Sequence, residues 1–325
     1  REHGGFAMTK RQKFIAALER QPISGHVPHF ELVFFLTMEV LGKVHPDHRK
    51  YTQWNQMTER EKQLHREDRA NCYIDIAKKY SHSAIFVGAP NSDIEEQLRF
   101  YSLVREKIGN ELFVMIYGDP TLGIPTGDRM SDFAAECAEQ PQKIKEYAQA
   151  AVDEHIREAE MLAKYPGLVD GFAMCSDYCF NTNPFFSPAM FSEFVTPYLS
   201  QIVRAYRDCG FYTIKHTDGN IMPILDQLIQ CRPHALHSLD PQAGVDLADV
   251  KRLVGNKVCL IGNVNCGLLQ TGTPEQAQAD VRRALQQGMP GYGYIFSTSN
   301  CIYTGMPLER YKMMHQIWRE EGIYS

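Results

Sequence analysis

The chain contains 325 residues, of which 44% are hydrophobic and 22% are charged, and its formal net charge is −5. This composition is typical of a globular protein with a large buried core, and the acidic balance argues against nucleic acid or an anionic membrane as the main partner. The longest apolar run, residues 32–42, contains Glu39 and is too short to cross a bilayer, so no membrane partner is expected.

The nine cysteines are an odd number and lack the spacing of a disulfide framework. Such usage is typical of a reducing compartment, so we expect a cytoplasmic protein. No secretory signal is visible. Residues 1–7, which precede Met8, resemble the remnant of an expression tag. We therefore expect a single domain over residues 8–325.

Three segments in the first half of the chain have the composition of β-strands. They are HVPHFELVF near residue 30, SAIFVGA near residue 86 and ELFVMIYGD near residue 115. Between the first two lies a charged insertion, residues 44–82, which is too long for a simple connection and is expected to be helical. It could be a solvated decoration or a lid over a substrate.

Strand and helix patterns alternate through the second half of the chain. The strands are GFAMCSDY, FYTIKHTDG, HALHSLDP, KVCLIGNVN and GYIFSTSN, each followed by a helical pattern. The helix after the first of these begins at the N-cap Ser187 and contains Pro197, which predicts a kink or two abutting helices. The helix that follows Thr273 has the capping-box pattern, completed by Gln276.

Counted together, these segments make eight apolar strands with helices between them. Parallel strands that are buried on both faces and alternate with helices are typical of a (β/α)8 barrel, the TIM barrel. An open doubly wound sheet is the alternative, but no Gly-x-Gly-x-x-Gly turn follows the first strand. We therefore predict an α/β fold, a TIM barrel with a helical N-terminal insertion.

In such a barrel the chemistry lies at the carboxyl ends of the strands, because the following loops converge there. His216 and Asp218 close the fifth predicted strand, Asp240 closes the sixth, and Cys301 follows the last. Residues two apart in an extended segment point to the same side, so His216 and Asp218 can both face the mouth. Imidazole, carboxylate and thiolate are zinc ligands, whereas magnesium and calcium sites rarely use sulfur or imidazole. The pattern predicts a zinc site with one open position.

Each of these residues also has an ordinary structural interpretation. His216 can be a hydrogen-bonded histidine at a strand end, and Asp218 before Gly219 can be a turn residue or a helix cap. Asp240 before Pro241 can be a turn residue in the same way. The sequence leaves open whether Asp218 or Asp240 is the third ligand.

Several segments of the second half resemble the uroporphyrinogen decarboxylase superfamily. They are SPAMFSEFVTPYLSQIV, IKHTDGNIMPILDQLI, VCLIGNVN and LLQTGTPEQAQADVRRAL, and the resemblance is strongest over residues 165–320. It implies a (β/α)8 barrel and one of two activities. One branch of the superfamily decarboxylates a porphyrinogen without a cofactor. The other contains zinc methyltransferases that work with corrinoid proteins, including those that methylate the thiol of coenzyme M.

Arginine content separates the two branches. A porphyrinogen carries many carboxylates, which arginine binds bidentately. The arginine-rich segment of the decarboxylases is replaced here by HFELVFFLTMEVLG, and SDYCFNTNPFF also lacks arginine. The resemblance therefore favours the methyltransferase branch, whose His-x-Cys and late Cys are matched by His216 and Cys301, while Asp218 stands where the first cysteine would be. The barrel ends are also similar to those of cobalamin-independent methionine synthase, which has an acidic ligand where Asp240 stands.

The resemblance implies a zinc-dependent methyltransferase that moves a methyl group between a small substrate and a corrinoid on a partner protein. An oxygen-containing ligand set favours ether cleavage, so a methoxylated aromatic is the expected methyl donor. A methylcorrinoid:thiol methyltransferase, a cofactor-free decarboxylase-like lyase and a barrel that only binds a corrinoid or small ligand are the alternatives. The residues expected to contact or orient the substrate are Glu31, Asp177, Tyr178 and Asn263, and His237 is a further candidate for the pocket wall.

Overall fold

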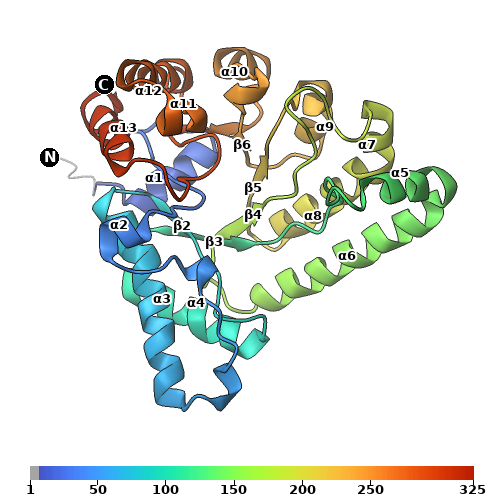
Figure 1. The fold of residues 1–325 in the computed structure, drawn as a ribbon, viewed down its shortest axis with the longest axis horizontal. Helices are drawn as coiled ribbons and strands as arrows, with labels where there is room; N and C mark the ends of the chain where they lie inside the picture. The colour runs from blue at the N-terminus through green and yellow to red at the C-terminus, as the bar shows by residue number, and fades with distance from the viewer. Residues whose placement is uncertain (1–6) are drawn as a thin grey trace, which may run out of the picture.

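A seven-stranded parallel sheet, with its strands in chain order, forms the centre of the computed structural model, which describes residues 7–325. The strands are β2 (Ala84–Phe86), β3 (Phe113–Tyr117), β4 (Gly171–Met174), β5 (Tyr212–Thr217), β6 (Ala235–Ser238), β7 (Cys259–Ile261) and β8 (Tyr294–Ile295). Helices surround this sheet (Figure 1). The expected tag remnant lies, except for Ala7, outside the described residues.

An extended segment around His29 occupies the eighth position of the barrel, between β8 and β2. The amide of Phe30 donates to the carbonyl of Phe296 (3.0 Å), directly after β8. On the other side, the amide of Ser83 donates to the carbonyl of His29 (2.8 Å), directly before β2. Pro28 lacks an N–H, which weakens regular strand pairing here. Because both edges of the sheet bond to this segment, the predicted (β/α)8 barrel is confirmed.

Helix α1 (Lys10–Leu18) covers the amino-terminal end of the barrel. Its Phe14 packs against Phe113 with ring centroids 4.7 Å apart, inside a cluster that receives buried side chains from each of the strands β2 to β8. Arg11 binds Asp170, just before β4, at 2.7 Å. Since this end is closed by packing, the carboxyl ends of the strands form the open mouth.

The outer helices follow the strands in the order expected for β/α units. They are α2 (Thr37–Leu41), α3 (Glu59–Lys79), α4 (Ile94–Ile108), α5 (Met130–Glu139), α6 (Pro141–Leu162), α7 (Pro188–Phe194), α8 (Thr196–Asp208), α9 (Leu225–Gln230), α10 (Leu247–Val254), α11 (Cys266–Thr271), α12 (Pro274–Gly288) and α13 (Leu308–Glu321). The predicted break at Pro197 is confirmed, because α7 and α8 abut there, and Thr273 and Gln276 form the predicted capping box. Within residues 7–325, none of the helices combines the length and apolar character needed to cross a membrane. A short antiparallel pair, β1 (Gly25–His26) and β9 (Ile323–Tyr324), joins segments from the two ends of the chain.

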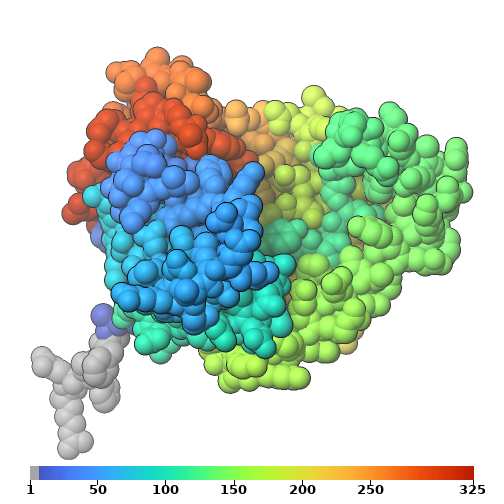
Figure 2. Space-filling view, turned by 60° about the horizontal axis from the view of Figure 1, so that its bottom comes forward, coloured from blue at the N-terminus to red at the C-terminus, as the bar shows by residue number. Residues whose placement is uncertain are grey.

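The predicted insertion, residues 44–82, is largely the helix of the first β/α unit. Thr58 and Glu61 form a capping box at the start of α3, and buried residues such as Ala70 and Ile74 lie on its inner face. The segment therefore contributes to the barrel and is more than a solvated decoration. In the space-filling view the blue segment that contains α3 stands beside a hollow in the surface, opposite the green segment of α5 and α6 (Figure 2).

Candidate metal centre

Three side chains with metal-binding atoms meet at the carboxyl ends of β4 and β5. Asp177 lies in the loop after β4, His216 lies near the end of β5, and Asp218 follows that strand. Nε2 of His216 is 3.6 Å from Oδ2 of Asp218 and 3.9 Å from Oδ1 of Asp177. One ligand atom from each of the three residues lies within 4.8 Å of the others. Over residues 7–325 this is the one group of three or more His, Cys, Asp or Glu side chains that is so compact.

The backbone explains why His216 and Asp218 share one side of β5. Side chains alternate along a strand, so Lys215 points the other way, where its Nζ lies 2.6 Å from Oδ2 of Asp119. Gly219 has a φ of +81°, and a Cβ at this position would lie 2.4 Å from the carbonyl oxygen of Cys179. Only glycine tolerates that conformation and that approach. The chain can therefore turn directly after Asp218 and leave its carboxylate at the mouth.

A hydrogen-bond chain behind His216 fixes which ring nitrogen carries the proton. Nε2 of His237 lies 3.0 Å from the carbonyl oxygen of Thr298, which can only accept, so this nitrogen is the protonated one. Burial, and then the neighbouring His216 ring, lower the pKa of His237 to about 3, so the ring is neutral and its Nδ1 accepts. Nδ1 of His216 lies 2.7 Å from that Nδ1 and donates to it. Because Nδ1 is engaged with His237, Nε2 is the nitrogen of His216 that faces the two carboxylates.

Asp218 is held by one side chain at the end of β6 and by another in the segment after β8. Oγ of Ser238 donates to its Oδ1 (2.7 Å), and Nδ2 of Asn300 donates to its Oδ2 (2.6 Å). Burial alone would raise the pKa of Asp218, but its interactions with His216 and Ser238 outweigh burial and lower the pKa. The carboxylate is therefore ionised at neutral pH.

Asp177 is the most exposed member of the cluster. Its side chain is 46% exposed, compared with 25% for Asp218 and 6% for His216. Its Oδ1 accepts a hydrogen bond from the amide of Asp218 (2.9 Å), which ties the loop after β4 to the end of β5. The cluster is thus open to solvent on the Asp177 side.

The donor set fits a divalent cation such as zinc. The imidazole nitrogen and the carboxylate oxygens face one another at 3.6 and 3.9 Å, a geometry that requires a proton or a cation between them. Zinc accepts imidazole and carboxylate together, and a catalytic zinc site uses three protein ligands with one position left open. His237 supplies the hydrogen bond that typically orients a metal-bound histidine.

Asp240 and Cys301, also expected among the ligands, lie beside the cluster but outside its group of three. Oδ2 of Asp240 accepts from the amide of Gly219 (3.1 Å), so this carboxylate supports the turn after Asp218. Burial raises the pKa of the Cys301 thiol, which donates to Oδ1 of Asn300 (3.1 Å). Because Asn300 also donates to Asp218, its amide group links the thiol to the cluster.

The other residues expected near the substrate occupy different environments. Glu31 lines a cavity beside the mouth. Tyr178 is fully buried, with its hydroxyl 2.5 Å from Oγ1 of Thr121. Asn263 is also fully buried, and its Nδ2 donates to the carbonyl of Leu239 (2.7 Å). Tyr178 and Asn263 therefore stabilise the barrel wall and present no surface to a ligand.

Sequence reasoning missed the side chains that orient Asp218. Ser238 ends β6, and Asn300 follows β8. Ser238 stands two residues before Asp240, and Asn300 directly precedes Cys301. Their position at the carboxyl ends of strands, close to candidate ligands, is the sequence signal that could have identified them.

A buried ion pair was missed as well. Nζ of Lys215 lies 2.6 Å from Asp119, and both side chains are 0% exposed. The same Nζ donates to the carbonyl of Ser176 (2.8 Å), so it joins the loops after β3 and β4, the second of which carries Asp177. A lysine inside an apolar strand is the signal, since lysine is buried only when it is paired.

Comparison with known proteins agrees with this architecture. Residues 126–321 match the family described as uroporphyrinogen decarboxylase (URO-D). No curated protein matches the chain. Among solved structures, a methyltransferase from Methanosarcina mazei is similar with a TM-score of 0.72 and 18% identity, covering 97% of this chain and 99% of that one.

Two further structures are only distantly similar. A D-psicose 3-epimerase from Clostridium cellulolyticum H10 has a TM-score of 0.45 and 12% identity, over 76% of this chain and 89% of that one. A sugar phosphate isomerase/epimerase from Parabacteroides distasonis ATCC 8503 has a TM-score of 0.44 and 11% identity, over 79% and 92%. Neither likeness is strong enough to bear on function.

The family match spans more than half of the chain and contains the whole candidate metal centre, from the loop after β4 to the segment after β8. The similarity to the Methanosarcina structure extends the shared fold over almost the full length. We conclude that the chain belongs to the uroporphyrinogen decarboxylase (URO-D) family.

Proposed function

We propose that this protein is a zinc-dependent methyltransferase that moves a methyl group between a small substrate and a corrinoid carried by a partner protein. The observation that carries the proposal is the compact group of Asp177, His216 and Asp218 at the barrel mouth. The fold shared with a methyltransferase from Methanosarcina mazei adds support.

In this proposal Asp177, His216 and Asp218 hold the zinc ion. The ion supplies a Lewis acid for the heteroatom of the substrate that carries the methyl group. His237 orients the ring of His216 so that Nε2 faces the site, and Asn300 orients Asp218. The exposed side of Asp177 leaves room for the substrate to approach. This set takes Asp177 in place of Asp240 and Cys301.

The ligand chemistry favours an ether substrate. Two carboxylates and one imidazole form a harder site than one that contains cysteine, and hard sites prefer oxygen donors. We therefore infer that the substrate is a methoxylated aromatic, which would lose its methyl group to the corrinoid. A methylcorrinoid:thiol methyltransferase is the second candidate, because the Cys301 thiol is linked to Asp218 through Asn300.

Decarboxylation of a porphyrinogen has less support. Its many carboxylates require arginine at the mouth. Residues 31–42, in and after the closing segment, and residues 175–186, in the loop after β4, contain no arginine. The cluster also contains two carboxylates, Asp177 and Asp218, which would repel a substrate that is itself polyanionic.

The proposal includes a corrinoid protein as partner and the cytoplasm as the compartment. All nine cysteines are free, which supports a reducing environment. A soluble corrinoid carrier would have to reach the mouth from the carboxyl ends of the strands, where the cluster is open on the Asp177 side.

The test combines zinc-loaded protein, a reduced corrinoid protein and a panel of methoxylated aromatics, with methylcorrinoid formation followed by its absorbance. We expect methylcorrinoid with at least one donor and none with His216→Ala. The matched control is His155→Gln, on helix α6, which should react like the wild type. Absence of methylcorrinoid with every ether and every methyl-thiol donor would refute the proposal.

A further inference from the structure

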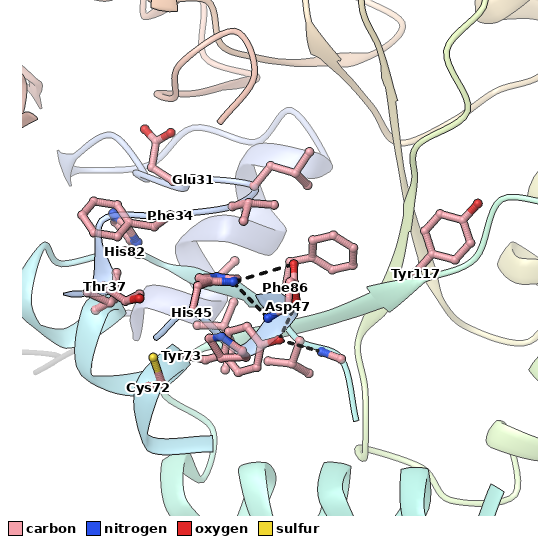
Figure 3. Close-up of a pocket in the computed structure, with 18 residues that line it drawn as sticks. Glu31, Phe34, Thr37, His45, Asp47, Cys72, Tyr73, His82, Phe86 and Tyr117 are labelled. Atoms are coloured by element: carbon pink, nitrogen blue, oxygen red, sulfur yellow. Dashed lines mark hydrogen bonds and ion pairs between the residues drawn. The ribbon is translucent and has the colours of Figure 1, made fainter. Parts of the chain in front are cut away.

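A cavity of about 220 Å³ lies on the side of the first barrel segment, and its lining extends to Tyr117 at the carboxyl end of β3. Its walls come from the closing segment, from β2 and from α3 (Figure 3). An apolar cavity of roughly 150 Å³ is enough to hold benzene. The cavity therefore has room for a single substituted ring and is far too small for a tetrapyrrole.

The lining is mainly apolar and aromatic. Phe34 and Phe86 supply ring faces, and Ile76 and Val87 supply aliphatic surface. Tyr117, at the end of β3, stands apart from the other labelled side chains (Figure 3), and it is 55% exposed. Asp47 is the other exposed side chain of the lining, and the two residues mark the rim of the cavity. Aromatic and aliphatic walls of this kind bind flat rings well.

The cavity offers no positive charge to a ligand. Over residues 7–325, the lining contains neither lysine nor arginine. Burial lowers the pKa of His45 to about 4 and that of His82 to about 3, so both rings are neutral at pH 7. Arg69 lies behind the wall, where its guanidinium donates to the carbonyl oxygens of Gly88 (2.5 Å) and Pro46 (2.8 Å). An anionic ligand would therefore be buried without a counter-ion.

Glu31 provides a buried polar group in the cavity without adding a charge. Its side chain is fully buried, and burial raises its pKa to about 8 despite the hydrogen bonds from Thr298. Oγ1 of Thr298 lies 2.6 Å from one oxygen of the carboxyl group, and Nε2 of His29 lies 3.2 Å from the other. At neutral pH the group is a carboxylic acid, which can both donate and accept a hydrogen bond.

The same residue connects the cavity to the metal centre. The amide and hydroxyl of Thr298 face Glu31, while the carbonyl of Thr298 accepts from His237, which in turn accepts from His216. Thr298 therefore contacts both Glu31 in the cavity wall and His237, which orients the proposed metal ligand His216. Glu31 in the cavity wall is thus connected to His216 through Thr298 and His237.

We propose that this cavity binds the ring of an uncharged, monocyclic aromatic methyl donor and discriminates against rings that carry a carboxylate. This inference rests on the proposed function, since it assumes that the substrate held here delivers its methyl group at the metal centre. The lining contains no lysine or arginine and includes the carboxyl side chain of Asp47, which disfavours a ring that carries a carboxylate, and the cavity volume limits the substrate to one ring.

The test measures binding to metal-free protein, which separates the cavity from the metal chemistry. Calorimetry would compare 2-methoxyphenol with its carboxylated counterpart, 4-hydroxy-3-methoxybenzoate. We expect the neutral ring to bind at least about tenfold more tightly, which corresponds to about 1.4 kcal/mol. Equal binding, tighter binding of the carboxylate, or tighter binding of tetramethylammonium than of the neutral ring would overturn the inference.

A charge introduced at the rim should change this preference. Tyr117→Arg places a guanidinium at the opening, and the ratio of the two dissociation constants should shift toward the carboxylated ring by at least about tenfold. Phe86→Arg is a second variant, which places the guanidinium inside the cavity in case the arginine of Tyr117→Arg extends into solvent. The control Tyr165→Arg lies in the loop before β4, at the other end of the barrel, and should leave the ratio unchanged.

The outcomes for the cavity and for the proposed function are distinguishable. If the neutral ring binds as expected but zinc-loaded protein forms no methylcorrinoid from it or from any other donor, the proposed function fails and the binding site stands. If methyl transfer proceeds equally well from the carboxylated ring, and neither arginine variant alters the preference, the cavity inference fails and the methyltransferase stands.

Discussion

The two halves of the barrel mouth differ in chemistry. The half formed by β4, β5, β6 and β8 contains the charged cluster, whose members are positioned by the hydrogen bonds of His237, Ser238 and Asn300. The half formed by the closing segment, β2 and α3 contains an apolar cavity whose titratable Glu31 is neutral at pH 7. One half of the mouth therefore presents charged groups, and the other presents an apolar cavity.

This difference suggests a division of labour. Activation of a methyl group needs electrostatic stabilisation at one atom, which preorganised charges supply. Recognition of the rest of the substrate needs complementary apolar surface. Thr298 belongs to both halves, because its side chain contacts Glu31 and its carbonyl holds His237.

The largest expected effect concerns the buried ion pair of the charged half. Lys215→Met would leave Asp119 buried without its partner, which typically costs about 3–5 kcal/mol of unfolding free energy. Urea denaturation measures this loss. The double variant Lys215→Met/Asp119→Leu removes the unpaired charge and should recover part of the stability. A loss below about 1 kcal/mol in the single variant would show that the pair does not hold this half together.

The next largest effect separates the candidate ligands. Asp218→Asn removes a negative ligand and should weaken zinc binding by about 10–100-fold or more, whereas Cys301→Ser should change it by less than about threefold. Competition with a chromophoric chelator measures both affinities. The reverse order would assign the thiol to the metal and would favour the thiol-methylating alternative.

The supporting histidine should have a smaller effect. His237→Ala removes the acceptor that fixes the proton on Nδ1 of His216, so zinc affinity should fall by about 10-fold. His237→Asn keeps an acceptor on a shorter side chain and should restore part of the zinc affinity. A purely structural defect in His237→Ala would not be rescued by this substitution. Unchanged affinity in His237→Ala would show that the tautomer of His216 is set by other contacts.

The smallest effect concerns the neutral half and its pH dependence. Burial raises the pKa of Glu31 from its ordinary value of 4.5 to about 8. Between those values the folded protein retains a proton that the unfolded chain has lost, so this group lowers stability as pH rises from about 4.5 to about 8. Glu31→Gln cannot titrate and should be less sensitive to pH over that window.

Urea denaturation at pH 5, 6.5 and 8 compares this variant with the wild type. The stability of Glu31→Gln relative to the wild type should rise with pH. A difference that stays constant across the three pH values would mean that Glu31 is ionised in the folded protein and adds a negative charge to the cavity.

Local signals in the sequence were sufficient for much of the barrel. Strands β4 to β8 were predictable because apolar runs alternate with capped helices, as at Ser187 and Thr273. The closing segment was harder, because around Pro28 it pairs only through scattered hydrogen bonds to β8 and β2. Helix α3 resembled an insertion because its charged outer face hides the period of its buried residues.

The candidate site was predictable only where one strand supplies it. His216 and Asp218 follow from the two-residue period of β5. Asp177 was expected to contact substrate, since nothing local shows that the loop after β4 folds back toward His216. Tyr178 and Asn263 lie at strand ends but point into the wall, and their neighbours are set by packing between elements distant in the chain.

Zinc titration of chelator-treated protein, followed by calorimetry, tests the central claim most directly. We expect one zinc ion per chain for the wild type, and at least about 100-fold weaker binding for His216→Ala with the fold intact by circular dichroism. No binding to the wild type, or equal binding to the variant, would contradict a metal centre at Asp177, His216 and Asp218.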